Sequence, residues 1–264
     1  MNITYDKFNM CMVDKKFVDA CLFVCVSGSH SFGWKTDKSD LDLRFVVMPE
    51  LSQIISPFYP MKTRQHIENK DTDNEIDITE YPISHFLVHL AKGNGNFVDN
   101  LFEPKLYEWK EEVKELQDIV KSHIHKGFID HCLGYSKHIK NDLSNETRLE
   151  KYGKSKLLLT RYRTLMQGFA LLDGKIEYNM DKLYKVTSDI FSKLPITVRD
   201  NYVKGIVDND LLNYCITDTD DLDYLLMVER DTSSLPDRHK STIDVLLDRW
   251  LRDRYIAKPY GVER

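Results

Sequence analysis

The stretch Ser27-Gly28-Ser29-His30-Ser31-Phe32-Gly33, followed shortly by Asp40-Leu41-Asp42-Leu43-Arg44, decides how this chain folds. The residues before it, 21–27, are apolar and rich in β-branched and aromatic side chains, which predicts a buried strand that ends at Gly28. The turn that follows offers backbone N–H groups and the Ser29 hydroxyl to phosphate oxygens. Gly28 and Ser29 are therefore candidate phosphate-binding residues.

Acidic side chains mark two further predicted strands. Residues 41–48 alternate at first and then become apolar, which predicts a strand with one polar face near its start. Because side chains alternate along a strand, Asp40 and Asp42 are expected on the same face, about 7 Å apart at Cα. Residues 75–81 alternate again and place Asp77 opposite its apolar neighbours. The sequence therefore predicts three carboxylates on one side of a sheet.

Three carboxylates on one face repel one another unless cations neutralise them. Mg²⁺ prefers a few carboxylates together with substrate phosphate oxygens, so Asp40, Asp42 and Asp77 are predicted to bind two Mg²⁺ ions, with Mn²⁺ as an alternative. Such a site activates an attacking hydroxyl and stabilises leaving pyrophosphate. A Gly-Ser or an Asp-x-Asp alone is usually a turn or a solvated surface. The prediction therefore depends on the order and spacing of the Gly-Ser turn, the Asp-x-Asp pair and Asp77 taken together.

The composition is that of a water-soluble protein with a full core. Of 264 residues, 42% are hydrophobic and 30% are charged, and 37 basic against 42 acidic residues give a net charge of -5. The chain lacks a run of the ~18 apolar residues that a membrane span needs and an apolar leader, so a cytoplasmic location without membrane contact is expected. Its five cysteines lack metal-type spacing and are interpreted as reduced and structural.

The motif set resembles that of the DNA polymerase beta-like nucleotidyltransferase superfamily. The residues of these motifs are most similar to those of one branch, the predicted nucleotidyltransferases encoded beside RNA ligase genes and proposed to act in RNA repair. The similarity continues in three later segments, which are residues 77–86, residues 93–102 and Ser234-Leu235-Pro236. The resemblance implies an α+β fold, with a mixed sheet flanked by helices and an all-helical C-terminal region. After Pro82 the apolar residues follow helical spacing, which predicts helices over residues 98–102, 107–125, 128–141, 154–172, 196–208, 220–229 and 242–255. We therefore expect a division near residue 105, between a catalytic domain over 1–105 and a helical nucleotide- or acceptor-binding region over 106–264.

In that family one helix carries a Lys, a His four residues on and an Arg three residues later. Here these positions are Lys156, Thr160 and Arg163, within a segment from Lys137 to Arg163 that holds eight Lys and Arg against three Asp and Glu. A spacing of seven puts Lys156 and Arg163 on one helix face, and both are predicted to bind the triphosphate. Thr160 departs from the family pattern. Arg44 has three open roles: neutralising a carboxylate, contacting a phosphate, or forming a structural salt bridge.

The activity implied by the resemblance is transfer of a nucleoside monophosphate from a nucleoside triphosphate (NTP) to a hydroxyl, with release of pyrophosphate. RNA is the expected acceptor, by analogy. Two alternatives stay open at this point: transfer to a protein, as in AMPylation or a toxin and antitoxin pair, and a non-catalytic nucleotide- or RNA-binding module. The choice of base, the number of additions and the oligomeric state are equally open.

Overall fold

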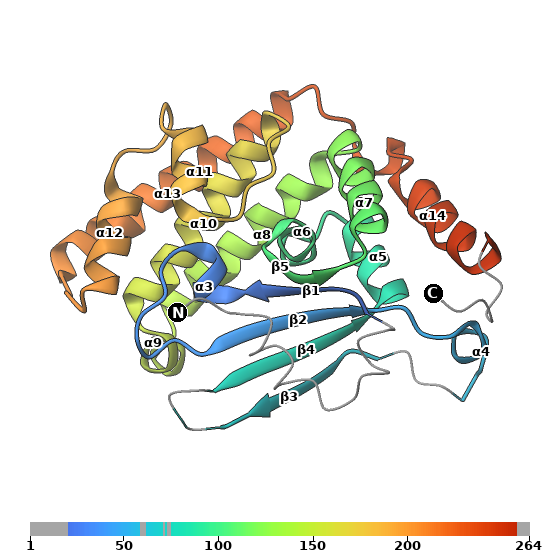
Figure 1. The fold of residues 1–264 in the computed structure, drawn as a ribbon. Helices are drawn as coiled ribbons and strands as arrows, with labels where there is room; N and C mark the ends of the chain where they lie inside the picture. Colours follow the sequence, from blue (N-terminus) through green and yellow to red (C-terminus); the bar gives the residue numbers. More distant parts are fainter. Residues whose placement is uncertain (1–20, 59–61, 71, 73–74, 258–264) are drawn as a thin grey trace.

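The computed structural model describes residues 21–58, 62–70, 72 and 75–257. A mixed sheet of five strands forms its base, in the order β3-β4-β2-β1-β5 (Figure 1). The strands are β1 (Cys21–Ser27), β2 (Leu41–Val47), β3 (Arg64–Glu68), β4 (Ile76–Pro82) and β5 (Lys105–Glu108). Strands β2 and β4 are parallel, and the other pairs are antiparallel. The predicted α+β architecture is therefore confirmed.

The two faces of the sheet differ in what they pack against. Phe23, Cys25 and Val46 belong to the large core that the sheet shares with the helices, whereas Val24 and Phe45 belong to a second, smaller buried cluster. This division follows from the alternation of side chains along β1 and β2. Asp42, Arg44 and Asp77 lie in phase with the helix-facing residues, so the polar part of the sheet is on the helix-covered side.

Most of the helices lie on that side of the sheet, whereas α4 (Leu51–Ile54) lies beyond the end of β2, level with the strands (Figure 1). The other helices are α3 (Gly28–Phe32), α5 (Ile83–Ala91), α6 (Gly95–Phe102), α7 (Lys110–Ser122), α8 (Lys126–Leu143), α9 (Glu146–Tyr152), α10 (Lys154–Leu172), α11 (Met180–Thr187), α12 (Leu194–Val203), α13 (Asn209–Thr232), the 3-10 turn η1 (Arg238–Lys240) and α14 (Ile243–Ala257).

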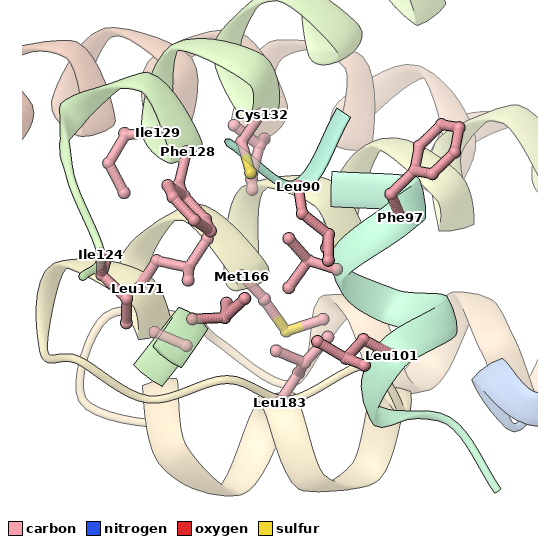
Figure 2. Close-up of a cluster of buried hydrophobic side chains, with 14 of the residues drawn as sticks. Leu90, Phe97, Leu101, Ile124, Phe128, Ile129, Cys132, Met166, Leu171 and Leu183 are labelled. Carbon is pink, nitrogen blue, oxygen red and sulfur yellow. The ribbon is translucent and has the colours of Figure 1, made fainter. Parts of the chain in front are cut away.

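Helix α10 is the centre of the helical layer, packed by α8, α11, α12 and α13. It is buried on nearly all sides by one wide apolar face and by charge pairing, because its buried Arg161 and Arg163 are paired with Asp side chains of α13 and α6. The side chains of α5, α6, α8 and α10 meet in one cluster, in which Figure 2 labels Leu90, Phe97, Leu101, Phe128, Cys132 and Met166. The four described cysteines, Cys21, Cys25, Cys132 and Cys215, are free and buried, as predicted.

Several element boundaries differ from the sequence-based predictions. Helix α10 begins and ends where it was predicted, but α13 is far longer than the predicted 220–229, and the helix predicted from 107 begins at Lys110. Strands β3 and β5 were not predicted. Strand β3 is an exposed edge strand of mostly polar residues, so it has no apolar alternation to detect. Strand β5 has only four residues.

The predicted domain division near residue 105 falls on β5, which pairs with β1 and so belongs to the sheet. The division itself stays a prediction. None of the helices in the described part of the chain is long and apolar enough to cross a membrane.

Candidate active site

The site begins at the turn between β1 and α3, where Gly28 adopts a positive φ of 65°. A Cβ atom placed on Gly28 would lie 2.0 Å from Oδ2 of Asp42, which is far inside van der Waals contact. Side chains other than hydrogen are thus excluded here both by the backbone conformation and by the carboxylate. Gly28 lets the Asp42 carboxylate lie directly against the Gly-Ser turn.

The strand register brings the predicted carboxylates together. Asp42 lies opposite Ser27 on β1 and opposite Asp77 on β4, while Asp40 lies just before β2. Burial raises the pKa of Asp42; the Arg44 charge opposes this rise, and the carboxylates of Asp40 and Asp77 add to it. Asp42 is therefore close enough to be repelled by Asp40 and by Asp77.

Arg44 partly neutralises this acidic group. Its Nη2 donates to Oδ1 of Asp42 at 2.7 Å, and its Nη1 lies 4.0 Å from Oδ1 of Asp77. Nη1 also donates to the backbone carbonyls of Leu43 and Asp77. Of the three roles that the sequence left open for Arg44, these contacts match two, the neutralisation of a carboxylate and a structural salt bridge.

The oxygen ligands of this site suit a hard divalent cation. They do not surround a single point as the ligands of a complete metal site do. Among the residues that the structure describes, no three His, Cys, Asp or Glu side chains form a ready metal-binding cluster. The available ligands are carboxylate oxygens, which Mg²⁺ and Mn²⁺ prefer. The pKa of Asp42 stays raised despite its ion pair with Arg44, so further positive charge would stabilise this carboxylate. The residues present fit such an ion.

Ser29 supplies an unused polar group beside the carboxylates. Its Oγ is buried and has no hydrogen-bond partner in the described part of the chain. Its backbone carbonyl accepts hydrogen bonds from the N–H groups of Gly33 and Trp34, which hold the turn closed. Because buried polar groups are normally hydrogen-bonded, this hydroxyl is suited to a ligand oxygen.

Comparison with known proteins decides the family. Residues 6–189 match the model of RlaP, described as the RNA repair pathway DNA polymerase beta family, and this match includes the turn, the carboxylates and α10. The chain belongs to this family. Membership confirms the resemblance seen in the motifs and makes the protein a member of a nucleotidyltransferase family.

Two solved structures resemble this RlaP-family protein at a distance. The spectinomycin adenyltransferase from Enterococcus faecialis with ATP and spectinomycin is 13% identical, with a TM-score of 0.49 over 84% of this chain and 99% of that one. A nucleotidyltransferase-like protein from Exiguobacterium sibiricum is 10% identical, with a TM-score of 0.33 over 98% of this chain and 93% of that one. No curated protein matches the chain in sequence.

The two residues predicted to bind the triphosphate from α10 have different surroundings in this family member. Arg163 is 2% exposed, donates from Nη1 to Oδ2 of Asp99 at 2.7 Å, and lies 3.9 Å from the ring centroid of Phe32 on α3. Lys156 is half-buried and forms no ion pair within the described residues. Both residues lie on α10 seven positions apart, and so on one helix face, but Arg163 is buried whereas Lys156 is partly exposed.

Thr160 replaces the His of the RlaP pattern and is engaged within its own helix. Its hydroxyl donates to the carbonyl of Lys156 at 2.8 Å, and its carbonyl accepts from the hydroxyl of Thr164. This back-bonding is common for Thr inside helices. In this protein the Thr160 hydroxyl is therefore hydrogen-bonded to the backbone of its own helix.

A buried polar network packs against the end of β1, next to the turn. This network was not predicted from the sequence. The Ser27 hydroxyl donates to Oε1 of Glu103 at 3.2 Å and to Oδ1 of Asn100 at 3.5 Å. The Lys105 ammonium donates to the carbonyls of Asn100, Leu101 and Glu103, where α6 ends. Burial raises the pKa of Glu103, and the neighbouring Asp99 charge adds to the rise. The sequence signal for this network is the presence of Asp99 and Glu103 in the largely apolar segment 97–103.

Proposed function

We propose that this protein is a divalent-cation-dependent nucleotidyltransferase that transfers a nucleoside monophosphate from an NTP to the hydroxyl of an RNA end and releases pyrophosphate. The observation that carries the proposal is the placement of the Asp42 carboxylate against the Gly28 turn, in register with Asp77. Phosphate-binding groups and acidic groups thus meet at one end of the sheet. A protein that only binds polyanions has no need of unneutralised acids there.

Each residue of the site has a proposed role. The N–H groups of Gly28 and Ser29 and the Ser29 hydroxyl bind the triphosphate, and Lys156 contacts it from α10. Asp40, Asp42 and Asp77 would hold the Mg²⁺ ions, which would supply neutralisation of phosphate charge and a lower pKa of the attacking hydroxyl. Arg163 acts as a positioning residue, because its contacts with Asp99 and Phe32 connect α10 to α6 and α3.

The reaction forms a bond between the acceptor oxygen and the α-phosphorus while the bond from the α-phosphorus to the bridging oxygen breaks. Asp77 accepts the proton of the hydroxyl, since its side chain is 33% exposed and that of Asp42 only 18%. Arg44 favours the ionised form of Asp42. The RNA acceptor is supported by the family to which the chain belongs.

The test is transfer of label from each α-labelled NTP, with Mg²⁺ or Mn²⁺, to RNA that carries either a free or a blocked 3′ hydroxyl. The Asp42→Asn and Asp77→Asn variants are compared with Asp248→Asn, an exposed acid of α14 whose ion pair lies on the surface. We expect label on the unblocked RNA with the wild type and with Asp248→Asn only. Absence of transfer by the wild type, equal transfer by all variants, or label on protein instead of RNA contradicts the proposal.

A further inference from the structure

A row of aromatic and imidazole rings begins beside the carboxylates and runs along the helices. Its first part joins β4, α5 and α6: the Tyr81 ring centroid lies 4.9 Å from that of Phe97, and the His89 ring stacks on Phe97 at 4.4 Å with an interplanar angle of 10°. Burial raises the pKa of Tyr81, and the charges of Arg44, Asp77 and Asp42 act on the same phenol. Tyr81 is therefore close to the proposed catalytic carboxylates.

The second part of the row follows one face of α8. His131, Tyr135 and His138 are spaced by four and three residues, so they share a helix face. The planes of neighbouring rings are nearly parallel: 16° between His131 and Tyr135, with centroids 6.2 Å apart, and 17° between Tyr135 and His138, at 6.4 Å. The His138 side chain is 59% exposed, and the other two are half-buried.

Gly95 joins the two parts at the first turn of α6. A Cβ atom there would lie 2.9 Å from Cδ2 of His131, so the glycine lets this ring pack against the helix that carries Phe97. Burial lowers the pKa of His131, and the charges of Arg163 and His89 lower it further. His131 is thus an uncharged flat ring near neutral pH, close to His89.

Basic residues stand at the far end of the row. On α9, Lys151 lies 5.0 Å and Arg148 5.8 Å from the ring centroid of Tyr152, and both side chains are exposed. Three acids are nearby: Glu146 and Glu150 are exposed on α9, and Asp142 of α8 lies 3.6 Å from His138 and 3.8 Å from Arg148. Lys151 forms no ion pair within the described residues. Helix α9 packs against α8 and α10, at the end of the molecule that holds α3 (Figure 1).

Flat rings combined with cations are what a protein needs to bind single-stranded nucleic acid, because every base has a face to stack and every phosphate carries a charge. We propose that this ring row, in which Tyr81, His89, His131, Tyr135 and His138 are partly or fully exposed and the buried Phe97 supports Tyr81 and His89, binds a single-stranded segment of the RNA acceptor, with Arg148 and Lys151 contacting its phosphates. The inference rests on the proposed transfer to RNA. It assigns a binding surface that leads from α9 to the carboxylates.

The test uses a fluorescein-labelled single-stranded RNA of about 15 nucleotides, which is the upper range for one such binding surface. Its affinity is measured by fluorescence anisotropy without NTP or divalent cation. We expect His138→Ala and Tyr135→Ala each to weaken binding by about tenfold, and Tyr135→Phe, which keeps the ring, to bind like the wild type. The double variant Arg148→Ala, Lys151→Ala should lower the salt dependence of log K by roughly 0.7 for each phosphate that it no longer neutralises.

The matched controls are Tyr224→Ala on α13, where the tyrosine is 67% exposed, and Lys182→Ala on α11, where the lysine side chain is 59% exposed. Both should leave the affinity unchanged. His138 and Lys151 are exposed, so loss of folding does not account for their effects. Equal affinity of the ring variants and the wild type, or equally tight binding of a fully paired RNA duplex, overturns the inference.

The same variants separate this inference from the proposed reaction. If the wild type transfers label and the ring variants bind RNA normally, the surface is wrong and the reaction stands. If the ring variants lose RNA affinity while the wild type transfers nothing, the surface stands and the reaction is wrong. When both hold, the ring variants raise KM for RNA and keep kcat at saturating RNA.

Discussion

Gly28 shows how much of this site depends on a single missing side chain. The backbone there has a positive φ, and the Asp42 carboxylate occupies the space of a Cβ atom. Glycine tolerates such a backbone at little cost, and the close approach depends on it. The contact links the two halves of the motif, since the turn and the carboxylates are separated by a loop in the chain.

Gly28→Ala is therefore expected to reduce nucleotidyl transfer by about 100-fold, because the new methyl group displaces the Asp42 carboxylate by an ångström or more. The measurement is kcat/KM, with the melting temperature recorded alongside. Gly153→Ala is the matched control, because Gly153 has a φ of 75° and nothing within 4 Å of a built Cβ. If both variants lose the same activity, backbone strain and not the carboxylate is responsible.

Glu103 makes a pH-dependent contribution to stability. Burial and the Asp99 charge raise its pKa in the folded state, so the folded protein binds a proton more tightly there than the unfolded chain does. Stability from this group is full below the ordinary Glu pKa of 4.5 and falls as the pH rises toward the raised value of about 8. Across that window the wild type should lose stability relative to Glu103→Gln, by up to about 1.4 kcal/mol per pH unit.

Urea unfolding of the wild type and Glu103→Gln at several pH values measures this difference. Glutamine keeps an acceptor for the Ser27 hydroxyl, so the hydrogen bond at the end of β1 is retained. A constant difference in unfolding free energy between pH 4.5 and 8 would show that Glu103 does not titrate in this range.

At the scale of elements, the ion pair between Arg163 and Asp99 connects α10 to α6. Gln167, one helical turn further along α10, also donates to Asp99 at 2.5 Å, and Phe32 of α3 lies against the guanidinium. Three helices thus meet at one buried charge pair. Such pairs are costly to break, because removal of one partner leaves the other charge buried and uncompensated.

Arg163→Met should reduce the unfolding free energy by about 3–5 kcal/mol through this mechanism. The double variant Arg163→Met, Asp99→Asn should recover part of the loss, since it no longer buries a lone carboxylate. Urea denaturation measures both effects, and NTP affinity is measured below the unfolding transition. Unchanged stability with a loss of NTP affinity would instead support the direct triphosphate contact expected from the sequence.

At the scale of the whole molecule, the acidic end of the sheet lies on the side that the helices cover. The net charge of -5 gives no general attraction for nucleic acid. Positive charge must therefore act locally, by cations at the carboxylates and by Arg148 and Lys151 on α9. A bound cation with NTP should stabilise the whole fold, because it binds the folded state only.

Mg²⁺ with a non-hydrolysable NTP analogue should therefore raise the melting temperature. At about 100 times the dissociation constant, the linkage contributes about 2.7 kcal/mol, which corresponds to roughly 5–10 °C for a chain of this size. Asp77→Asn should remove most of the shift, and Asp248→Asn should retain it. A full shift with Asp77→Asn would exclude Asp77 from the cation site.

Short elements escaped prediction in both the sheet and the helical layer. Helix α10 was recognised because it has no Gly or Pro until its final turns and is strongly apolar, whereas α9 and α11 are only seven and eight residues long and escaped prediction. Strand β3 also escaped, since it is held by backbone pairing with β4 and not by an apolar face. Short or polar elements are stabilised by their neighbours, which local periodicity does not record.

The β1 turn and the acidic faces of the strands that carry Asp42 and Asp77 can be read from the sequence alone, because side-chain alternation and short-range spacing dictate them. The pairing of β2 with β4, which sets Asp42 beside Asp77, is a tertiary feature. Only the tertiary structure decided that Arg163 is buried against Asp99, 64 residues away in the chain, and that rings from β4, α5, α6 and α8 form one row. The physical reason is that a charged residue has the same appearance in a sequence whether water or a distant partner compensates its charge, and packing makes that choice.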